Sequence, residues 1–323
     1  MRALVPILVL LLAAGCASET AFVSPAPAAS APQASGLISF NTAGSLNRTT
    51  SGRNFALGAP VPISGDLQFP QGEGPFPAVV LAHGCNGNRN TERAWGPTLR
   101  AWGFATLVID SFRPRGLDEV CTKGRALVPL ERVPDAYGAL RLLAAHPKVD
   151  PKRVVLMGFS HGGSLTMLAA TAWAKETFAP AGQPAFRAFV PFYPNCNAVF
   201  PERDRVAAPL RIHTGELDDW TPAKPCAELA TLLKAQGQDV AINVYPGAHH
   251  AFDQAARQVF LPNVGNGADC FPRLPSLLGP FPPGAAGNQQ TPCVKRGATV
   301  AGNAAAAAQA RSNLRAQLDE LIR

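Results

Sequence analysis

One serine of the sequence has surroundings that favour nucleophilic chemistry. Ser160 is the central residue of Gly158-Phe-Ser-His-Gly162, which lies between an apolar run at 153–157 and a segment with helical spacing. Glycines at the two outer positions permit a tight strand-to-helix turn that exposes the serine hydroxyl. The pattern predicts that Ser160 is a nucleophile. The alternative is a serine that only caps the following helix.

A serine hydroxyl is a weak nucleophile at neutral pH and needs a neighbouring base. The adjacent His249 and His250 follow the last apolar run of the chain. Asp218 and Asp219 follow the run before it. A carboxylate at either position would orient the imidazole and stabilise its charged form. The chain order serine, aspartate, histidine is that of α/β hydrolases, but the spacing leaves both choices open within each pair.

An acyl-transfer site also needs hydrogen-bond donors for the oxyanion that forms on the attacked carbonyl. The backbone amide of His161, directly after Ser160, is one candidate. The other is the amide of Cys85, in the loop that follows the apolar run at 78–82. We expect the His83 side chain to support this loop by a hydrogen bond rather than to act as the base.

Segments typical of strands and helices alternate along most of the chain. Continuous apolar runs, which are typical of strands buried on both faces, lie at 78–82, 105–109, 153–157, 186–190, 210–212 and 240–244. Helical spacing is found at 91–102, 135–145, 164–175, 227–235 and 304–323. The alternation predicts an α/β-hydrolase fold, with a doubly wound, mostly parallel sheet and helices on both faces. The segment at about 256–301 breaks the rhythm, so an irregular insertion is expected there.

The first fifteen residues have the layout of a secretory signal, with a positive start, an apolar stretch and small residues before Cys16. Leu12-Ala-Ala-Gly-Cys16 resembles the lipobox of bacterial lipoproteins, whose cysteine is acylated. We predict a signal peptide at 1–15, an acylated Cys16, an Ala/Pro/Ser-rich tether at 16–36 and a hydrolase domain at 37–323. The expected location is the bacterial cell envelope, periplasmic or surface-exposed, with membrane contact through the lipid anchor only. The alternative is ordinary cleavage further along, for instance after Ala34.

Composition disfavours several classes of protein. Hydrophobic residues make up 47% of the chain, enough for a sizeable core, and the net charge of +7 is not gathered into a block. A nucleic-acid binder is therefore disfavoured. Spacings typical of zinc ligands and of phosphate- or dinucleotide-binding loops are missing, so we expect no metal and no cofactor. The sequence leaves the oligomeric state open.

Six cysteines remain when Cys16 is set aside, and an even number in an exported chain suggests disulfides. Six cysteines allow fifteen pairings. The simplest pairing joins neighbours along the chain: Cys85 with Cys121, Cys196 with Cys226, and Cys270 with Cys293. The first bond would tether the oxyanion loop, and the last would organise the irregular segment.

Five segments together resemble the dienelactone hydrolase family of α/β hydrolases. They are HGCNG at 83–87, DSFRPRG at 110–116, GFSHGG at 158–163, GELDDWTP at 215–222 and YPGAHHAF at 245–252, and they span roughly 75–255. The resemblance implies that Asp218 is the acid and that His250 is the base, with His249 at a position often held by glycine. The enzymes that give this family its name use a cysteine nucleophile, whereas this chain has Ser160. The resemblance therefore implies a serine esterase rather than an enzyme specific for dienelactone.

We expect a serine hydrolase that cleaves a small-molecule carboxylic ester or lactone through an acyl-enzyme intermediate. Arg113 and Arg115 are candidates for binding a substrate carboxylate, or else they hold the loop at Asp110 by salt bridges. Trp220 is expected to shape the pocket. Two other functions stay open. One is a serine peptidase of the prolyl-oligopeptidase type, which the lack of a propeller-sized N-terminal domain disfavours, and the other is a non-catalytic binding lipoprotein of the cell envelope.

Overall fold

A computed structural model describes residues 35–322, except 50–53, 88–90, 125 and 281–292. The predicted signal peptide, Cys16 and most of the predicted tether lie outside the described residues. By their contacts, the described residues belong to one compact unit. Among the helices of the described residues, none is long and apolar enough to cross a membrane.

A large sheet runs through this unit, with eight strands in the part of the chain that the structure describes. In spatial order they are β1 (Gly36–Asn41), β4 (Pro62–Gln68), β6 (Ala105–Asp110), β5 (Phe76–Ala82), β7 (Val149–Phe159), β8 (Ala188–Phe192), β9 (Leu210–Gly215) and β10 (Val240–Tyr245). The strands from β6 to β10 are parallel, while β1 and β4 are antiparallel to their neighbours. The predicted doubly wound, mostly parallel sheet is confirmed. The antiparallel strands β1 and β4 were not predicted.

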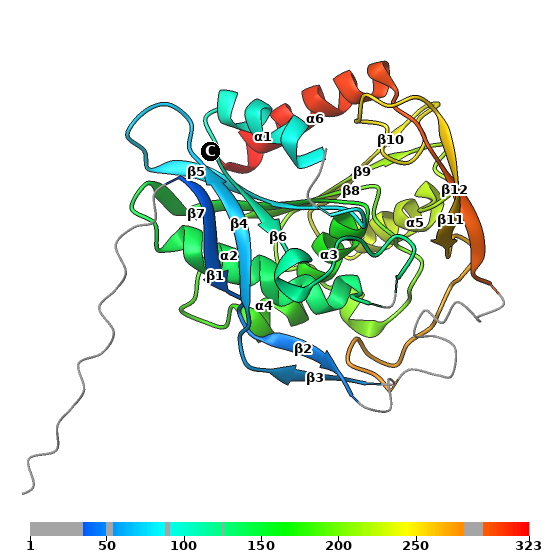
Figure 1. The fold of residues 1–323 in the computed structure, drawn as a ribbon, viewed down its shortest axis with the longest axis horizontal. Coiled ribbons are helices and arrows are strands. Elements are labelled where there is room, and N and C mark those ends of the chain that lie inside the picture. Colours follow the sequence, from blue (N-terminus) through cyan, green and yellow to red (C-terminus); the bar gives the residue numbers. More distant parts are fainter. Residues whose placement is uncertain (1–34, 50–53, 88–90, 125, 281–292, 323) are drawn as a thin grey trace, which may run out of the picture. The chain divides into compact units, whose positions relative to one another are not determined.

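The apolar runs form strands because helices cover both faces of the sheet. On β5, Val79 and Leu81 pack into one hydrophobic cluster, and Val80 packs into the other. A run that is apolar at every position is what such two-sided burial requires. The helices α2 (Val133–Ala144), α3 (His161–Ala169) and α5 (Ala223–Ala235) lie on one face, and α1 (Thr91–Ala101) and α6 (Ala304–Ile322) lie on the other (Figure 1).

The helix expected at 164–175 is in fact interrupted. A second helix, α4 (Ala172–Phe178), begins after Thr171, whose hydroxyl accepts a hydrogen bond from the amide of Ala174 at 3.1 Å. Thr171 has an extended backbone, so it caps α4 and cannot continue α3. The apolar spacing is the same on both sides of the break, which is why periodicity predicted one helix.

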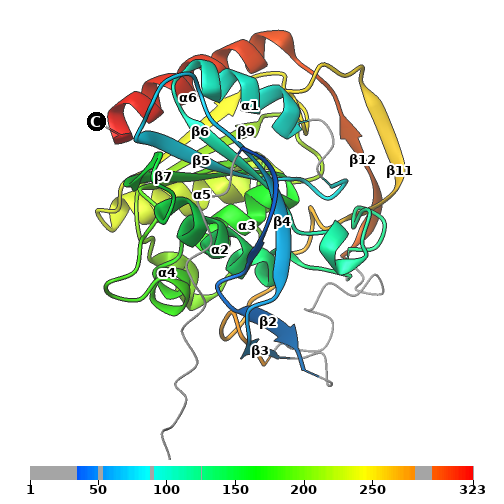
Figure 2. The same ribbon diagram turned by 60° about the vertical axis from the view of Figure 1, so that its left-hand side comes forward.

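Two antiparallel strand pairs lie outside the large sheet (Figure 2). One is the hairpin of β2 (Ser45–Arg48) and β3 (Phe55–Gly58), and the other joins β11 (Val259–Asn266) to β12 (Lys295–Val300). The segment expected to be irregular at about 256–301 therefore has paired strands near both ends. Short 3-10 helices are η1 (Arg113–Arg115), η2 (Pro129–Arg132) and η3 (Pro201–Asp204).

Three disulfides join cysteines that neighbour one another along the chain, the simplest of the possible pairings. They are Cys85–Cys121, Cys196–Cys226 and Cys270–Cys293, with sequence separations of 36, 30 and 23 residues. Loops of this length lower the entropy of the unfolded chain enough to contribute about 3–4 kcal/mol of stability each. The first bond holds the loop after β5, the second ties the segment after β8 to α5, and the third closes the segment between β11 and β12.

Candidate active site

Ser160 lies on a strained turn between β7 and α3. Its φ of 54° and ψ of −112° belong to a region that residues with side chains rarely adopt, and such a turn presents the hydroxyl at the end of the strand. A side chain at Gly158 would collide with the carbonyl of Gly162, and one at Gly162 would collide with the carbonyl of Ala82. Close packing of the turn therefore requires glycine at both outer positions of the motif.

A histidine and an aspartate from distant parts of the chain meet at Ser160. The Ser160 hydroxyl lies 2.9 Å from Nε2 of His250, and Nδ1 of His250 lies 2.8 Å from Oδ2 of Asp218. Each residue follows a parallel strand (β7, β9 or β10), so all three lie at the carboxyl edge of the sheet. His250 is 2% exposed and Asp218 is 4% exposed. This arrangement can pass the hydroxyl proton to the imidazole while the carboxylate faces the opposite ring nitrogen.

Hydrogen bonds give the two adjacent aspartates different environments. Oδ1 of Asp218 accepts from the amides of Trp220 at 2.9 Å and Thr221 at 2.8 Å, which leaves Oδ2 directed at His250. Asp219 instead accepts hydrogen bonds from the amide and the hydroxyl of Thr299, both at 2.8 Å. Asp218 therefore contacts the imidazole, and Asp219 fastens β12 to the loop after β9.

Aromatic rings and a buried carboxylate hold the imidazole in place. The ring of His250 contacts those of Tyr193 and Trp220, with centroid distances of 4.7 and 4.9 Å. The Tyr193 hydroxyl donates to Asp253 at 2.9 Å, and Nε1 of Trp95 donates to the same carboxyl at 2.7 Å. Burial raises the pKa of Asp253. This network leaves no local pattern in the sequence, because its members are far apart in the chain and belong to no motif.

The loop after β5 lies directly beside Ser160. A Cβ atom at Gly84 would be 3.7 Å from the Cβ of Ser160. Nδ1 of His83 donates to the Gly84 carbonyl at 2.8 Å, and Nε2 of His83 accepts from the amide of Ser111 at 3.2 Å. Burial lowers the pKa of His83 well below its ordinary value. His83 is thus a neutral support of this loop, in which Cys85 follows Gly84.

A buried arginine connects the Cys85 loop to the start of α3. Nη1 of Arg132 donates to the His83 carbonyl at 3.0 Å and to Nδ1 of His161 at 2.7 Å. Nε2 of His161 donates to the Leu127 carbonyl at 3.0 Å. Burial and the charge of Arg132 lower the pKa of His161, so its ring is neutral at pH 7. His161 is the first residue of α3, where a backbone amide has no acceptor within the helix.

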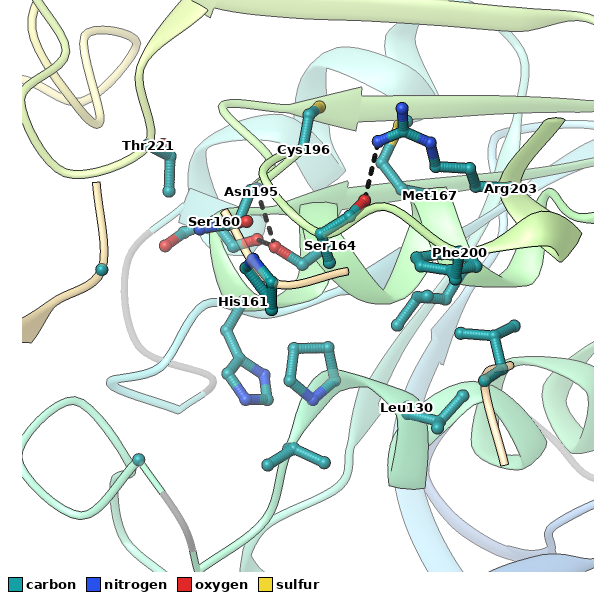
Figure 3. A pocket seen from close by; sticks show the side chains of 18 of the residues that line it. Leu130, Ser160, His161, Ser164, Met167, Asn195, Cys196, Phe200, Arg203 and Thr221 are labelled. Carbon is teal, nitrogen blue, oxygen red and sulfur yellow. Dashed lines mark hydrogen bonds between the residues drawn. The ribbon is translucent and has the colours of Figure 1, made fainter. Parts of the chain in front are cut away.

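A cavity of about 490 Å³ reaches Ser160, with Cys85, His161 and Trp220 among the residues that line it. Figure 3 shows Ser160, Ser164 and Met167 in succession along the cavity, with Phe200 and Arg203 at the end away from Ser160. The volume is within the range of pockets for small-molecule ligands.

Neither Arg113 nor Arg115 is among the described residues that line this cavity. Arg115 forms two hydrogen bonds with the buried carboxylate of Asp135, at 2.9 and 2.7 Å. The Arg113 side chain is 75% exposed and lies 3.8 Å from Asp110. Arg115 therefore connects the segment after β6 to α2, and Arg113 forms a surface ion pair with the Asp110 loop; a role of either in binding a substrate carboxylate stays a prediction. Among the described residues no cluster of His, Cys, Asp or Glu could hold a metal ion.

A match to a family model identifies the proteins to which this chain is related. The model of the dienelactone hydrolase family matches residues 63–269, a span that includes Ser160, Asp218 and His250. The chain belongs to the dienelactone hydrolase family. As a member of this family, it is a carboxylic ester hydrolase.

Curated relatives of this dienelactone hydrolase family member include a lactonase and an esterase. A probable 2-oxo-3-(5-oxofuran-2-ylidene)propanoate lactonase of Bradyrhizobium sp is 26% identical over 218 residues, which cover 62% of this chain and 84% of the relative. Esterase EstD of Thermotoga maritima is 31% identical over 110 residues, which cover 32% of this chain and 26% of the relative.

Solved structures share the fold. A dienelactone hydrolase-like promiscuous phosphotriesterase, P91, from metagenomic libraries superimposes with a TM-score of 0.55 at 18% identity, and the match covers 89% of this chain and all of that one. The family model itself ends at residue 269. The chain from Cys270 onward, including β12 and α6, therefore lies outside the span that the family model describes.

Proposed function

We propose that this protein is a serine hydrolase of carboxylic esters or lactones, with Ser160 as nucleophile, His250 as base and Asp218 as the residue that orients the base. The observation that carries the proposal is the position of the His250 imidazole, which is within hydrogen-bond distance of both Ser160 and Asp218. Burial of His250 and Asp218 excludes water from the carboxylate–imidazole pair, which strengthens their interaction.

The arrangement supports a two-step reaction. Nε2 of His250 takes the proton of the Ser160 hydroxyl while Oγ attacks the ester carbonyl carbon, and the carbonyl electron pair moves onto oxygen. The backbone amides of Cys85 and His161 donate to this oxyanion. Its collapse breaks the bond to the alcohol oxygen, which takes the proton from His250. Water then attacks the acyl-enzyme and gives a proton to His250, and the second collapse releases the acid and returns the proton to Ser160.

The cysteines support serine rather than thiol chemistry. All six cysteines in the described residues are joined in disulfides, so none of them offers a thiolate near the site. Cys85 contributes only its backbone amide, and its side chain fixes the loop through Cys121.

For a lactone substrate, the same two steps give a single hydroxy acid, because the alcohol and the acid belong to one molecule.

Neighbouring residues supply matched controls for this proposal. Turnover of p-nitrophenyl acetate is expected to fall by about 10⁴-fold or more in Ser160→Ala and His250→Ala, the scale seen when one member of a catalytic triad is removed. His249→Ala and Asp219→Asn should each keep turnover within about threefold of the unmodified protein, whereas Asp218→Asn should not. Equal loss in the two histidine variants, or full turnover in Ser160→Ala, contradicts the assignment.

We further infer that the hydrolase is exported and anchored by a lipid at Cys16, with 16–36 as a tether. The three disulfides support export, because such bonds persist in oxidising compartments. Expression of the full chain in a bacterium that processes lipoproteins tests the anchor. We expect the protein in the membrane fraction with an acyl mass increase on Cys16, and Cys16→Ser in the soluble fraction. Membrane attachment that survives this substitution contradicts the proposal.

A further inference from the structure

The cavity at Ser160 borders the proposed oxyanion donors, and we infer that it receives the acyl part of an ester. It is lined by Ser160 and by Cys85 and His161, whose amides are the proposed oxyanion donors, whereas His250 is not among its lining residues. The leaving alcohol receives its proton from His250 and therefore departs on the side of the imidazole. The acyl group remains on Ser160, next to the cavity. This step rests on the proposed function.

Beyond Ser160 the cavity is lined mostly by apolar side chains, with Ser164 and Asn195 as polar neighbours of Ser160. Met167 and Leu168, which are seven and eight residues after Ser160, line it along α3, and Leu229 and Leu233 line it from α5. With a rise of 1.5 Å per residue, Met167 lies about 10 Å along the helix from Ser160, a distance spanned by an extended chain of about eight carbon atoms. An acetyl group would leave most of this space unfilled.

The arginines that line the cavity have partners. Nη2 of Arg48 lies 3.0 Å from Glu131, and Arg203 donates to the carbonyl of Ala198 at 2.8 Å and lies 3.4 Å from the carboxylate of Asp204. Each guanidinium already faces a carboxylate of the protein. The cavity is therefore suited to a neutral hydrocarbon chain rather than to an acyl group with a second carboxylate.

The segment between β11 and β12 supplies one wall of this cavity. Pro272, Leu274, Leu277 and Val294 line it, and all four lie beyond the end of the family match. The wall is held by main-chain hydrogen bonds with Val199, which donates to the Pro272 carbonyl and accepts from the Leu274 amide, both at 2.8 Å. Leu277 is buried in the same hydrophobic cluster as α3 and α5.

We propose that this cavity is an acyl-binding pocket for medium-chain fatty acids, of about six to ten carbon atoms, and that its wall residues Pro272, Leu274 and Leu277 set the chain length it accepts. Each methylene that moves from water into such a pocket improves kcat/KM by up to about fourfold. The gain continues until the chain fills the pocket and then stops or reverses. Chain-length selectivity thus comes from a segment outside the family's matched region.

A series of p-nitrophenyl esters from acetate to palmitate tests the proposal on the full-length protein. We expect kcat/KM to peak near the octanoate ester, at least about tenfold above the acetate ester. Acetate esters of alcohols from ethanol to octanol should show no comparable rise. A peak at acetate, or a rise only along the alcohol series, overturns the proposal while leaving the serine hydrolase intact. Absence of turnover on every ester would instead contradict the proposed function.

Two variants should lower turnover of the octanoate ester more than turnover of the acetate ester. They are Met167→Trp, which narrows the α3 side, and Leu274→Trp, which narrows the wall beyond the family match. Phe271→Trp is the matched control, because Phe271 is in the same segment, is 59% exposed and is not among the lining residues. An octanoate-to-acetate ratio that falls about tenfold in both variants and not in the control supports the proposal. An unchanged ratio in folded Leu274→Trp contradicts the role of the segment.

Discussion

Replacing Arg132 with methionine is expected to slow turnover more than it weakens substrate binding. Arg132 is completely buried, and its Nη1 donates to the His83 carbonyl and to the His161 ring. His83 is two residues before Cys85, and His161 itself carries the second proposed oxyanion amide. One guanidinium therefore fixes the relative position of both donors. An oxyanion hole depends on such fixed geometry, because its donors must already be in place when the charge forms.

The magnitude follows from the bonds that the variant loses. A hydrogen bond to a charged group contributes about 1.5–3 kcal/mol, so two such bonds give an upper limit of about 3–6 kcal/mol in unfolding free energy. Removing a buried charge offsets part of this loss, and we expect a net decrease of about 1–3 kcal/mol. Complete loss of one oxyanion donor lowers kcat by about 10²–10³. Because Arg132 only positions the donors, we expect kcat to fall about 10- to 100-fold with KM within about threefold.

Steady-state kinetics with p-nitrophenyl acetate can separate this effect from simple destabilisation. Active sites are counted by titration with a fluorophosphonate, so kcat refers to folded protein only, and urea unfolding gives the change in stability. Arg132→Lys keeps one charged donor and should give an intermediate kcat. If Arg132→Met lowers stability but leaves kcat per labelled site unchanged, Arg132 supports the fold alone and the reasoning is refuted.

Two further changes test the supports of the site. Burial raises the pKa of Asp253 above its ordinary value of 3.8. The folded protein therefore holds the carboxyl proton more tightly than the unfolded chain does. As the pH rises above 3.8, the unfolding free energy of the wild type should fall relative to that of Asp253→Asn. Urea unfolding from pH 3.5 to 7 should show that the difference in unfolding free energy between the two proteins increases with pH. A constant difference contradicts the prediction. Replacing both Cys270 and Cys293 with serine should lower the unfolding free energy by about 3 kcal/mol, the value for a loop of this length. A loss below about 1 kcal/mol would contradict this, because it would mean that other contacts already restrain the segment.

Much of the fold could be predicted because its strands are buried on both faces. Every residue from Val79 to Leu81 must be apolar in such a strand, and this leaves a pattern that can be recognised locally. The antiparallel strands β1 and β4 alternate between buried positions and partly or fully exposed ones, so neither contains a continuous apolar run. The break at Thr171 depends on one capping hydrogen bond rather than on periodicity.

The site shows the same division between local and distant causes. Ser160 could be identified because the collisions at Gly158 and Gly162 are set within one turn of chain. Spacing could not separate Asp218 from Asp219, since both follow β9 directly, and the family resemblance was needed to choose. In the structure the difference arises from Thr299, eighty residues away, which takes up the carboxylate of Asp219.

The supports of the site and the cavity wall could not be predicted for a related reason. Arg132, Tyr193 and Asp253 act on the site through partners that are distant in sequence, and a lone buried arginine or aspartate leaves no local pattern. The wall residues at 272–277 show no periodicity, because main-chain hydrogen bonds with Val199 hold them rather than a helix. Such segments can be assigned a role only after the elements they touch are known.

Covalent labelling with a fluorophosphonate, followed by peptide mass spectrometry, tests the central claim most directly. The account predicts one adduct per chain, located on Ser160, with labelling about 10³-fold slower or more in His250→Ala and unchanged in His249→Ala. A folded protein that is not labelled would contradict the central claim. So would labelling at another residue, with Ser160→Ala labelled as fast as the wild type.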